Sequence, residues 1–141
     1  MSLLWMIAGC TQTGNPLSST DTVTRGTLDY ILASPARPYQ PGDTLTATVT
    51  VHNTGSITDT AVGGGGNLEW FLVTTTGDTL FVGGPGDNVV ELVPVPPGQS
   101  KQLYSIKWPL SRNLLGSFPT GFYSLRVTVR PVSMAVNFYV Q

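Results

Sequence analysis

The sequence predicts an all-β domain, arranged as a two-sheet antiparallel sandwich of about seven to nine short strands with almost no helix. Three observations lead to this fold class. Apolar and polar residues alternate with a period of two in two clear segments, 45–52 and 121–130. Turn-forming residues recur at spacings of about ten residues between the apolar segments. No stretch combines sustained helical periodicity with a capping residue.

Length and composition set the limits for what the chain can be. Its 141 residues suit one domain, which needs no disulfide to form a core. Charged residues make up only 11% of the sequence, with seven Lys plus Arg against eight Asp plus Glu, so no basic field is present to hold nucleic acid. One Cys and one His are too few for a structural zinc site, and we expect no metal and no cofactor.

The first ten residues form a segment that is similar to a lipoprotein signal. The apolar run is too short to span a bilayer, and it ends in Ile7-Ala8-Gly9-Cys10. This tetrapeptide resembles the bacterial lipobox, whose cysteine is acylated while the preceding peptide is removed. The resemblance implies a lipid anchor at Cys10 and an extracytoplasmic, membrane-anchored protein of a bacterial cell envelope, in the periplasm or at the cell surface. The alternative is an apolar N-terminus with an ordinary free thiol.

A polar segment separates this start from the globular part. Residues 11–24 are small and polar with almost no large apolar side chain, so the sequence predicts a flexible tether there. The β-sandwich domain is then expected over residues 25–141. Its first strand is predicted at 27–33, where Leu28, Tyr30 and Leu32 share one face, and Pro35 and Pro38 follow the strand.

The central strand follows the turn Pro41-Gly42-Asp43. Its buried face is expected to carry Leu45, Ala47, Val49 and Val51, and its solvent face three threonines and His52. His52 is the only imidazole that could act as a base, and its place among threonines favours a solvated spacer over a catalytic group. After this strand, the four glycines of 63–66 predict a mobile surface loop, with an anion cradle as the alternative.

The second half continues the same pattern. Residues 68–82 predict a β-hairpin that turns at Thr76-Gly77-Asp78, and residues 89–93 a short strand. The proline-rich segment 94–98 is expected to connect the sheets without belonging to either. Strands are then predicted at 99–108, at 121–130 and around Val136, Phe138 and Val140.

The connection 110–120 is the main candidate for a binding loop. It holds apolar side chains that suit either a lid over the core or an exposed contact surface. As a loop presented to a serine protease, its Arg112 and Asn113 would suit a trypsin-like enzyme, and Leu114 and Leu115 a subtilisin-like one. The candidate binding residues are Arg112, Asn113, Leu114, Leu115 and Phe118.

Several motifs occur together in an order that resembles a known family. They are Pro41-Gly42-Asp43 before alternating Thr and Val, His52-Asn53-Thr54-Gly55, Trp70, Thr76-Gly77-Asp78, Pro97-Gly98-Gln99, Tyr104, Trp108 and Gly121-Phe122-Tyr123. This order is similar to the BsuPI domain, named after an intracellular proteinase inhibitor of bacilli. The resemblance implies an immunoglobulin-like β-sandwich, and one Cys excludes the disulfide of the antibody branch.

Three functions remain open from the sequence. The leading one is a non-catalytic binding or structural module of the cell envelope, making contact through its loops at 56–67, 83–88 and 110–120 or through its strand edges. The second is a proteinase inhibitor that presents residues 110–120. The third is a subunit of a surface filament or a multi-domain adhesin. We find no motif of paired carboxylates or of an activated serine, so no catalytic residue is expected. A protein partner and the membrane are the expected contacts.

Overall fold

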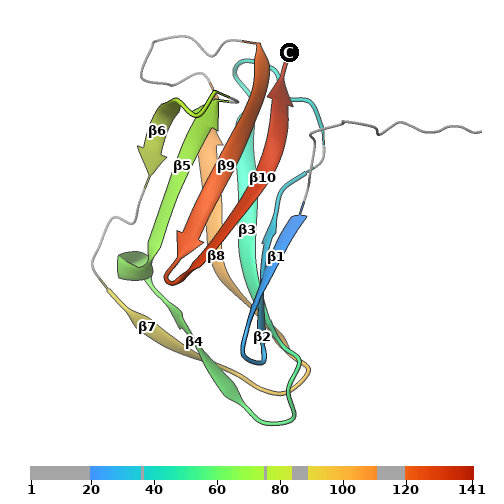
Figure 1. Ribbon diagram of the computed structural model, residues 1–141, viewed down its shortest axis with the longest axis vertical. Coiled ribbons are helices and arrows are strands. Elements are labelled where there is room, and N and C mark those ends of the chain that lie inside the picture. The colour runs from blue at the N-terminus through green and yellow to red at the C-terminus, as the bar shows by residue number, and fades with distance from the viewer. Residues whose placement is uncertain (1–19, 36, 75, 84–88, 111–119) are drawn as a thin grey trace, which may run out of the picture.

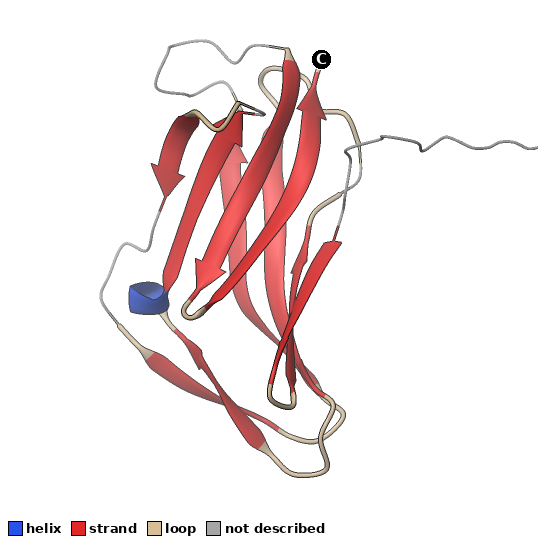
Figure 2. Ribbon diagram, in the orientation of Figure 1, coloured by secondary structure: helices blue, strands red, loops and turns tan. Residues whose placement is uncertain are grey.

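The computed structural model describes residues 20–35, 37–74, 76–83, 89–110 and 120–141. Within these ranges the chain forms ten strands and one short 3-10 turn, coloured red and blue in Figure 2. The elements are β1 (Thr20–Arg25), β2 (Leu28–Ala33), β3 (Thr44–Asn53), β4 (Asp59–Gly63), η1 (Gly65–Asn67), β5 (Leu68–Thr74), β6 (Thr79–Gly83), β7 (Glu91–Val95), β8 (Ser100–Pro109), β9 (Gly121–Val129) and β10 (Val132–Val140). The all-β prediction is confirmed, although two more strands form than the eight that the pattern located.

The strands build two antiparallel sheets and a separate ribbon. One sheet has the order β1-β2-β3-β8 and the other the order β10-β9-β5-β6, while β4 has β7 as its one partner among the described strands. Figure 1 shows the second sheet lying in front of the first, with the β4–β7 ribbon below both. We call the end of the sandwich that carries this ribbon the lower end. No helix in the described ranges has the length and apolar character needed to cross a membrane.

The core lies between the inner faces of the two sheets. The alternation predicted for β2, β3 and β9 is confirmed: Leu32, Val49 and Leu125 are fully buried, while their sequence neighbours are at least partly exposed. Aromatic rings also make contact across this core. Trp70 meets Trp108 edge-on at 5.9 Å between ring centroids, joining the two sheets. In β2, β3 and β9 the period of two is enough to identify the inward side chains.

The folded domain begins earlier than the sequence predicts. Residues 20–24, expected to be part of the tether, belong to β1, which pairs along its whole length with β2. The segment Thr-Asp-Thr-Val-Thr-Arg has Val23 as its only apolar residue, so its sequence shows no alternation that would predict a strand. Its order comes from non-local contacts: the Asp21 carboxylate accepts a hydrogen bond of 2.8 Å from the Ala135 amide on edge strand β10.

The glycine run is ordered structure and not the mobile loop that the sequence suggests. Gly63 ends β4, and the glycines after it lead into η1. Gly64 has a positive φ of 84°, and a Cβ atom there would lie 2.5 Å from the Val89 carbonyl oxygen. The Tyr104 hydroxyl also donates to the Gly64 carbonyl at 2.8 Å. These glycines therefore allow close backbone approach, a requirement that depends on residues distant in sequence.

The proline-rich segment is also partly a strand. Pro94 and Val95, expected in a connection between sheets, form the second half of β7, paired with Thr60 and Asp59 of β4. Proline is compatible with this position because β7 has a strand neighbour on one side only. The short strand expected at 89–93 is thus shifted by two residues toward the C-terminus.

Candidate functional site

Most residues singled out by the sequence lie outside the described ranges. Cys10 does, and so do residues 11–19 of the tether and the candidate binding residues Arg112, Asn113, Leu114, Leu115 and Phe118. Of the loop 110–120, the structure describes the two end residues, Leu110 and Thr120. Leu110 is fully buried, and its amide donates to the Asp43 carbonyl at 2.8 Å. The lipid anchor and the binding loop at 110–120 stay predictions.

His52 lies in a row of three side chains that invites comparison with a catalytic triad. Asp29, His52 and Ser100 occupy directly paired positions on β2, β3 and β8. However, the His52 Nδ1 atom is 2.8 Å from the Ser100 hydroxyl, so the serine occupies the position that the carboxylate takes in a triad. Asp29 instead accepts a hydrogen bond from the Thr24 hydroxyl at 2.6 Å. The three side chains therefore do not have the carboxylate–imidazole–hydroxyl order of a catalytic triad.

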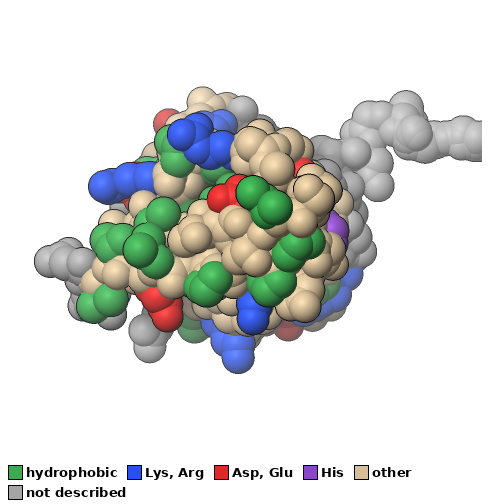
Figure 3. Space-filling model, turned by 90° about the horizontal axis from the view of Figure 1, so that it is seen from below, with side chains coloured by type: hydrophobic (Ala, Val, Ile, Leu, Met, Phe, Trp, Pro, Cys, Tyr) green, Lys and Arg blue, Asp and Glu red, His purple; other side chains and the backbone are tan. Residues whose placement is uncertain are grey.

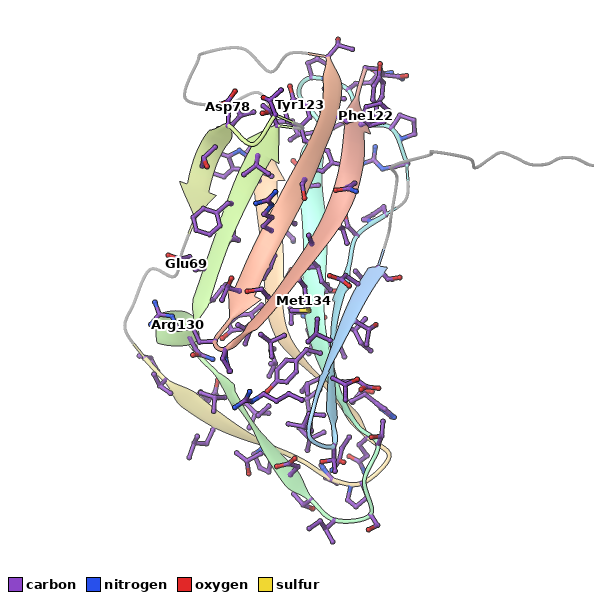
Figure 4. All side chains as sticks on the ribbon, in the orientation of Figure 1. Glu69, Asp78, Phe122, Tyr123, Arg130 and Met134 are labelled. Atoms are coloured by element: carbon purple, nitrogen blue, oxygen red, sulfur yellow. The ribbon has the colours of Figure 1, made fainter. Side chains whose placement is uncertain are left out.

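The outward side chains of the predicted strand 121–130 do not form one patch. Phe122, Arg126 and Arg130 share a face in the alternation pattern and could together make a contact surface. However, Phe122 lies near the upper end of the sandwich, whereas Arg130 lies at the lower end beside η1 (Figure 4). The Phe122 ring packs on Tyr139 with 4.6 Å between centroids. The arginines also differ, since Arg126 lines a groove on the outer sheet face and Arg130 lines a different cleft.

The largest exposed aliphatic side chains gather around the β4–β7 ribbon. Its inner face carries Ala61 and Val95, which are fully buried against the core. Its outer face carries Thr60, Val62, Leu92 and Pro94, because Thr60 pairs with Pro94 and Val62 pairs with Leu92. We call these four residues the ribbon face. Leu92 is 69% exposed, and Val90 and Ile57 nearby in sequence are 59% and 73% exposed. Seen from below, hydrophobic side chains lie among a few charged ones (Figure 3).

A cleft of about 650 Å³ opens beside the ribbon face. Its walls are the β1–β2 turn with Arg25, the β9–β10 turn with Arg130 and Pro131, and the β4 strand with Asp59 and Val62. We call it the lower cleft. Val62 belongs both to this cleft and to the ribbon face, so the two features form one continuous surface.

A buried asparagine holds the ribbon against the end of β3. The fully buried Asn53 amide donates to the Ile57 carbonyl at 2.7 Å and to the Val95 carbonyl at 2.8 Å. Its Oδ1 atom accepts a hydrogen bond of 2.8 Å from the Gly55 amide. The sequence indicates Asn53 only as a turn residue after the strand. Its three partners could not be found from the pattern, because Val95 is brought near only by the fold.

The charges in the lower cleft have defined surroundings. The hydrogen bond from the Thr27 hydroxyl, followed by that from the Thr60 amide, holds the pKa of Asp59 below its usual value. Burial raises the pKa of the Tyr30 phenol, with smaller opposing effects from Arg25 and Asp59. Neither Arg25 nor Arg130 makes an ion pair within the described ranges. Within the same ranges no group of His, Cys, Asp and Glu is arranged to hold a metal ion.

The lowered pKa values predict how stability depends on pH. Asp43, hydrogen-bonded by the Gln40 amide and then by Arg37, also has a lowered pKa. A carboxyl with a lower pKa in the folded state contributes stability above its unfolded pKa of about 4, and this is lost as pH falls through the folded value. We expect Asp59→Asn and Asp43→Asn each to flatten the decline in stability below about pH 4. Urea unfolding at several pH values measures this, and unchanged slopes in both variants would contradict it.

Comparisons with known proteins bear on the fold alone. No family model matches the sequence, and no curated protein matches it. Among solved structures, a β-glucosidase from Erythrobacter marinus is similar at a TM-score of 0.51 and 11% identity, covering 86% of this chain and 16% of that one. A β-glucosidase from Listeria innocua reaches 0.47 at 14% identity, covering 84% of this chain and 17% of that one. The DNA glycosylase AlkC of Pseudomonas fluorescens reaches 0.49 at 12% identity, covering 77% and 28%.

All three of these proteins are much longer than this chain. The chain spans less than a third of each of these three larger proteins. At such low identity the likeness to the Erythrobacter protein shows that the sandwich architecture recurs, and nothing about activity.

Proposed function

We propose that this protein is a non-catalytic binding module of the bacterial cell envelope, anchored to the membrane through an acylated Cys10 and contacting a protein partner with its lower end. The anchor and the location rest on the lipobox-like sequence Ile7-Ala8-Gly9-Cys10. The contact surface rests on the continuity of the lower cleft with the ribbon face. A β-sandwich is suited to this role because its loops and end strands are presented on a rigid scaffold.

The exposed aliphatic side chains support a partner at this end. Isolated apolar residues on a surface need no explanation, but a cluster beside a cleft is typical of an interaction site. Complete burial of Leu92, now 69% exposed, would contribute roughly 1.5–3 kcal/mol. Val90 and Ile57, which precede β7 and β4 at opposite ends of the ribbon, are also exposed. A contact of this kind would have an apolar centre surrounded by polar and charged groups, as protein interfaces usually have.

The charge around the ribbon face favours a protein over a lipid surface. Asp59 and Glu91 stand at the first positions of β4 and β7, and the alternation places both carboxylates on the opposite side of the ribbon from the ribbon face. With Arg25 and Arg130 of the adjoining cleft, these charges balance, so an anionic lipid surface would gain no net attraction here. A polypeptide can instead place apolar side chains on Leu92 and basic or amide groups near the carboxylates.

Photo-cross-linking in the cells that produce the protein tests this proposal. We expect a photoreactive phenylalanine analogue at Leu92 to give one discrete adduct, identifiable by mass spectrometry. The same analogue at Lys107, which is exposed on the outer face of β8, serves as the matched control and should give none. An adduct formed only from position 114 would instead favour the loop 110–120 and the proteinase-inhibitor function. Adducts of equal yield at Leu92 and Lys107 would reject a specific contact at the ribbon face.

A further inference from the structure

We infer that the lower cleft is a carboxylate-binding site that receives an acidic side chain of the partner polypeptide while adjacent aliphatic side chains of the same segment cover the ribbon face. This inference rests on the proposed function and specifies the chemistry of the partner. It follows from the positions of Arg25 and Arg130, from the ionised carboxylate of Asp59 and from the apolar side chains that line the same cleft.

The two arginines come from different hairpins and meet at one cleft. Arg25 is the last residue of β1, at the β1–β2 turn, and Arg130 follows β9 at the β9–β10 turn. The Arg130 backbone is fixed beside η1, because its amide donates to the Asn67 carbonyl at 3.3 Å. Both arginine side chains are exposed, and neither is in an ion pair within the described ranges. Guanidinium groups in this situation are available to bind an oxyanion.

The third charge in the cleft determines which oxyanion fits. Asp59 lines the same cleft, and its two carboxylate oxygens already accept hydrogen bonds from the Thr27 hydroxyl and the Thr60 amide, each at 2.8 Å. It stays ionised at neutral pH, so the two arginines and Asp59 together carry one net positive charge. That balance matches a carboxylate, whereas a phosphate group near its dianionic state would meet repulsion from Asp59.

The uncharged lining suggests what stands next to the carboxylate. Leu28, Val62 and Pro131 line the cleft between the charged groups, and Tyr30 is buried beneath it. Val62 continues into the ribbon face and pairs with Leu92. A segment that places its acidic side chain between Arg25 and Arg130 would therefore direct neighbouring residues over aliphatic surface. The matching sequence has a Glu or Asp followed by aliphatic residues.

Capped peptides provide the test without knowledge of the natural partner. The full 141-residue chain would be labelled with ¹⁵N and titrated with acetyl-Val-Glu-Leu-Val-amide and with the same peptide carrying Gln in place of Glu. We expect the Glu peptide to bind at least about tenfold more tightly, with the largest shifts at Arg25, Arg130 and Val62. Arg25→Ala and Arg130→Ala should each remove this preference. Arg126 is an exposed arginine on β9, the strand that leads into the β9–β10 turn. Arg126→Ala is therefore the matched control and should keep the preference for the Glu peptide.

A charge-raising variant gives an independent check. Asp59→Asn raises the net charge of the cleft, so we expect tighter binding of the Glu peptide and the appearance of competition by inorganic phosphate. The inference is overturned by equal affinity for the two peptides, by an equal loss in Arg126→Ala, or by phosphate competing better than acetate in the unaltered chain. Dispersed spectra in each variant show that the fold is intact. Adduct formation at Leu92 that is unaffected by Arg25→Ala would keep the proposed function and reject only the carboxylate site.

Discussion

Replacing Asn53 with alanine is expected to lower the free energy of unfolding by about 3 kcal/mol and to loosen the β4–β7 ribbon. The side chain is fully buried and makes three hydrogen bonds, to the Ile57 and Val95 carbonyls and from the Gly55 amide. Alanine would remove all three bonds. It would leave the buried Val95 carbonyl without this partner, and it would also leave the partly buried Ile57 carbonyl and Gly55 amide without theirs. An unpaired buried group costs about 1–3 kcal/mol, so the total is large for a single substitution.

The location of the loss should also be measurable. Because Val95 lies in β7 and Ile57 lies just before β4, we expect amide hydrogens of β4 and β7 to exchange faster in Asn53→Ala, while those of β9 change only with global stability. Urea unfolding gives the free energy, and hydrogen exchange gives its distribution. Thr48→Ala, on the outer face of the same strand, is the control and should cost less than about 1 kcal/mol. Equal effects of Asn53→Ala and Thr48→Ala would show that the hydrogen bonds do not hold the ribbon.

This dependence links stability to the proposed contact. The ribbon face and one wall of the lower cleft are both built on β4. The ribbon consists of two strands, and an isolated two-stranded ribbon is only marginally stable. Its own pairing is therefore not enough to hold it in place. Asn53 and the inward side chains Ala61 and Val95 therefore supply the anchoring. We expect Asn53→Ala to weaken binding at the lower cleft even though Asn53 does not line it.

Most of the sandwich could be predicted because its central strands bury one face and expose the other. In β3 and β9 the period of two identifies the inward residues without reference to any partner strand. β1 was not predicted because Val23 is its only apolar residue, and its order depends on the contact of Asp21 with the distant β10 as well as on its pairing with β2. β4 was not predicted because the glycines at its end suggest a mobile loop. Gly64 is needed there because the Val89 carbonyl lies too close to leave room for a Cβ atom. Each failure involves a contact that is distant in sequence.

The candidate site was harder to predict for the same reason. In the sequence, Arg25 marks only the boundary between tether and domain, and Arg130 is a charge at the end of a strand. Nothing in the local sequence indicates that two hairpin turns bring these residues to one cleft. Alternation fixes which face a residue occupies but not which strand or turn lies beside it. The residues that sequence reasoning does favour, in 110–120, lie almost entirely outside the described ranges.

Gly83→Ala is expected to destabilise the domain by about 2 kcal/mol through overpacking against an indole ring. Gly83 is directly paired with Trp70 across β5 and β6, and the indole lies over the glycine. A Cβ atom at this position would lie 2.6 Å from the Trp70 Nε1 atom and closer still to two ring carbons. Trp70 has little freedom to move aside, because it is buried and meets Trp108 edge-on between the sheets.

A second strand glycine separates this effect from the general consequence of adding a methyl group. Gly63 also ends a strand and is buried, but a Cβ atom there would meet its nearest neighbours at 3.6 Å or more, an ordinary contact distance. Gly63→Ala should therefore be neutral or slightly stabilising, since alanine loses less backbone entropy on folding. In the double variant Trp70→Leu with Gly83→Ala, the added cost of the alanine should nearly vanish because the ring is gone. Urea unfolding of these variants measures the coupling, and a cost of Gly83→Ala that persists in the Trp70→Leu background would place its cause in the backbone and not in the indole.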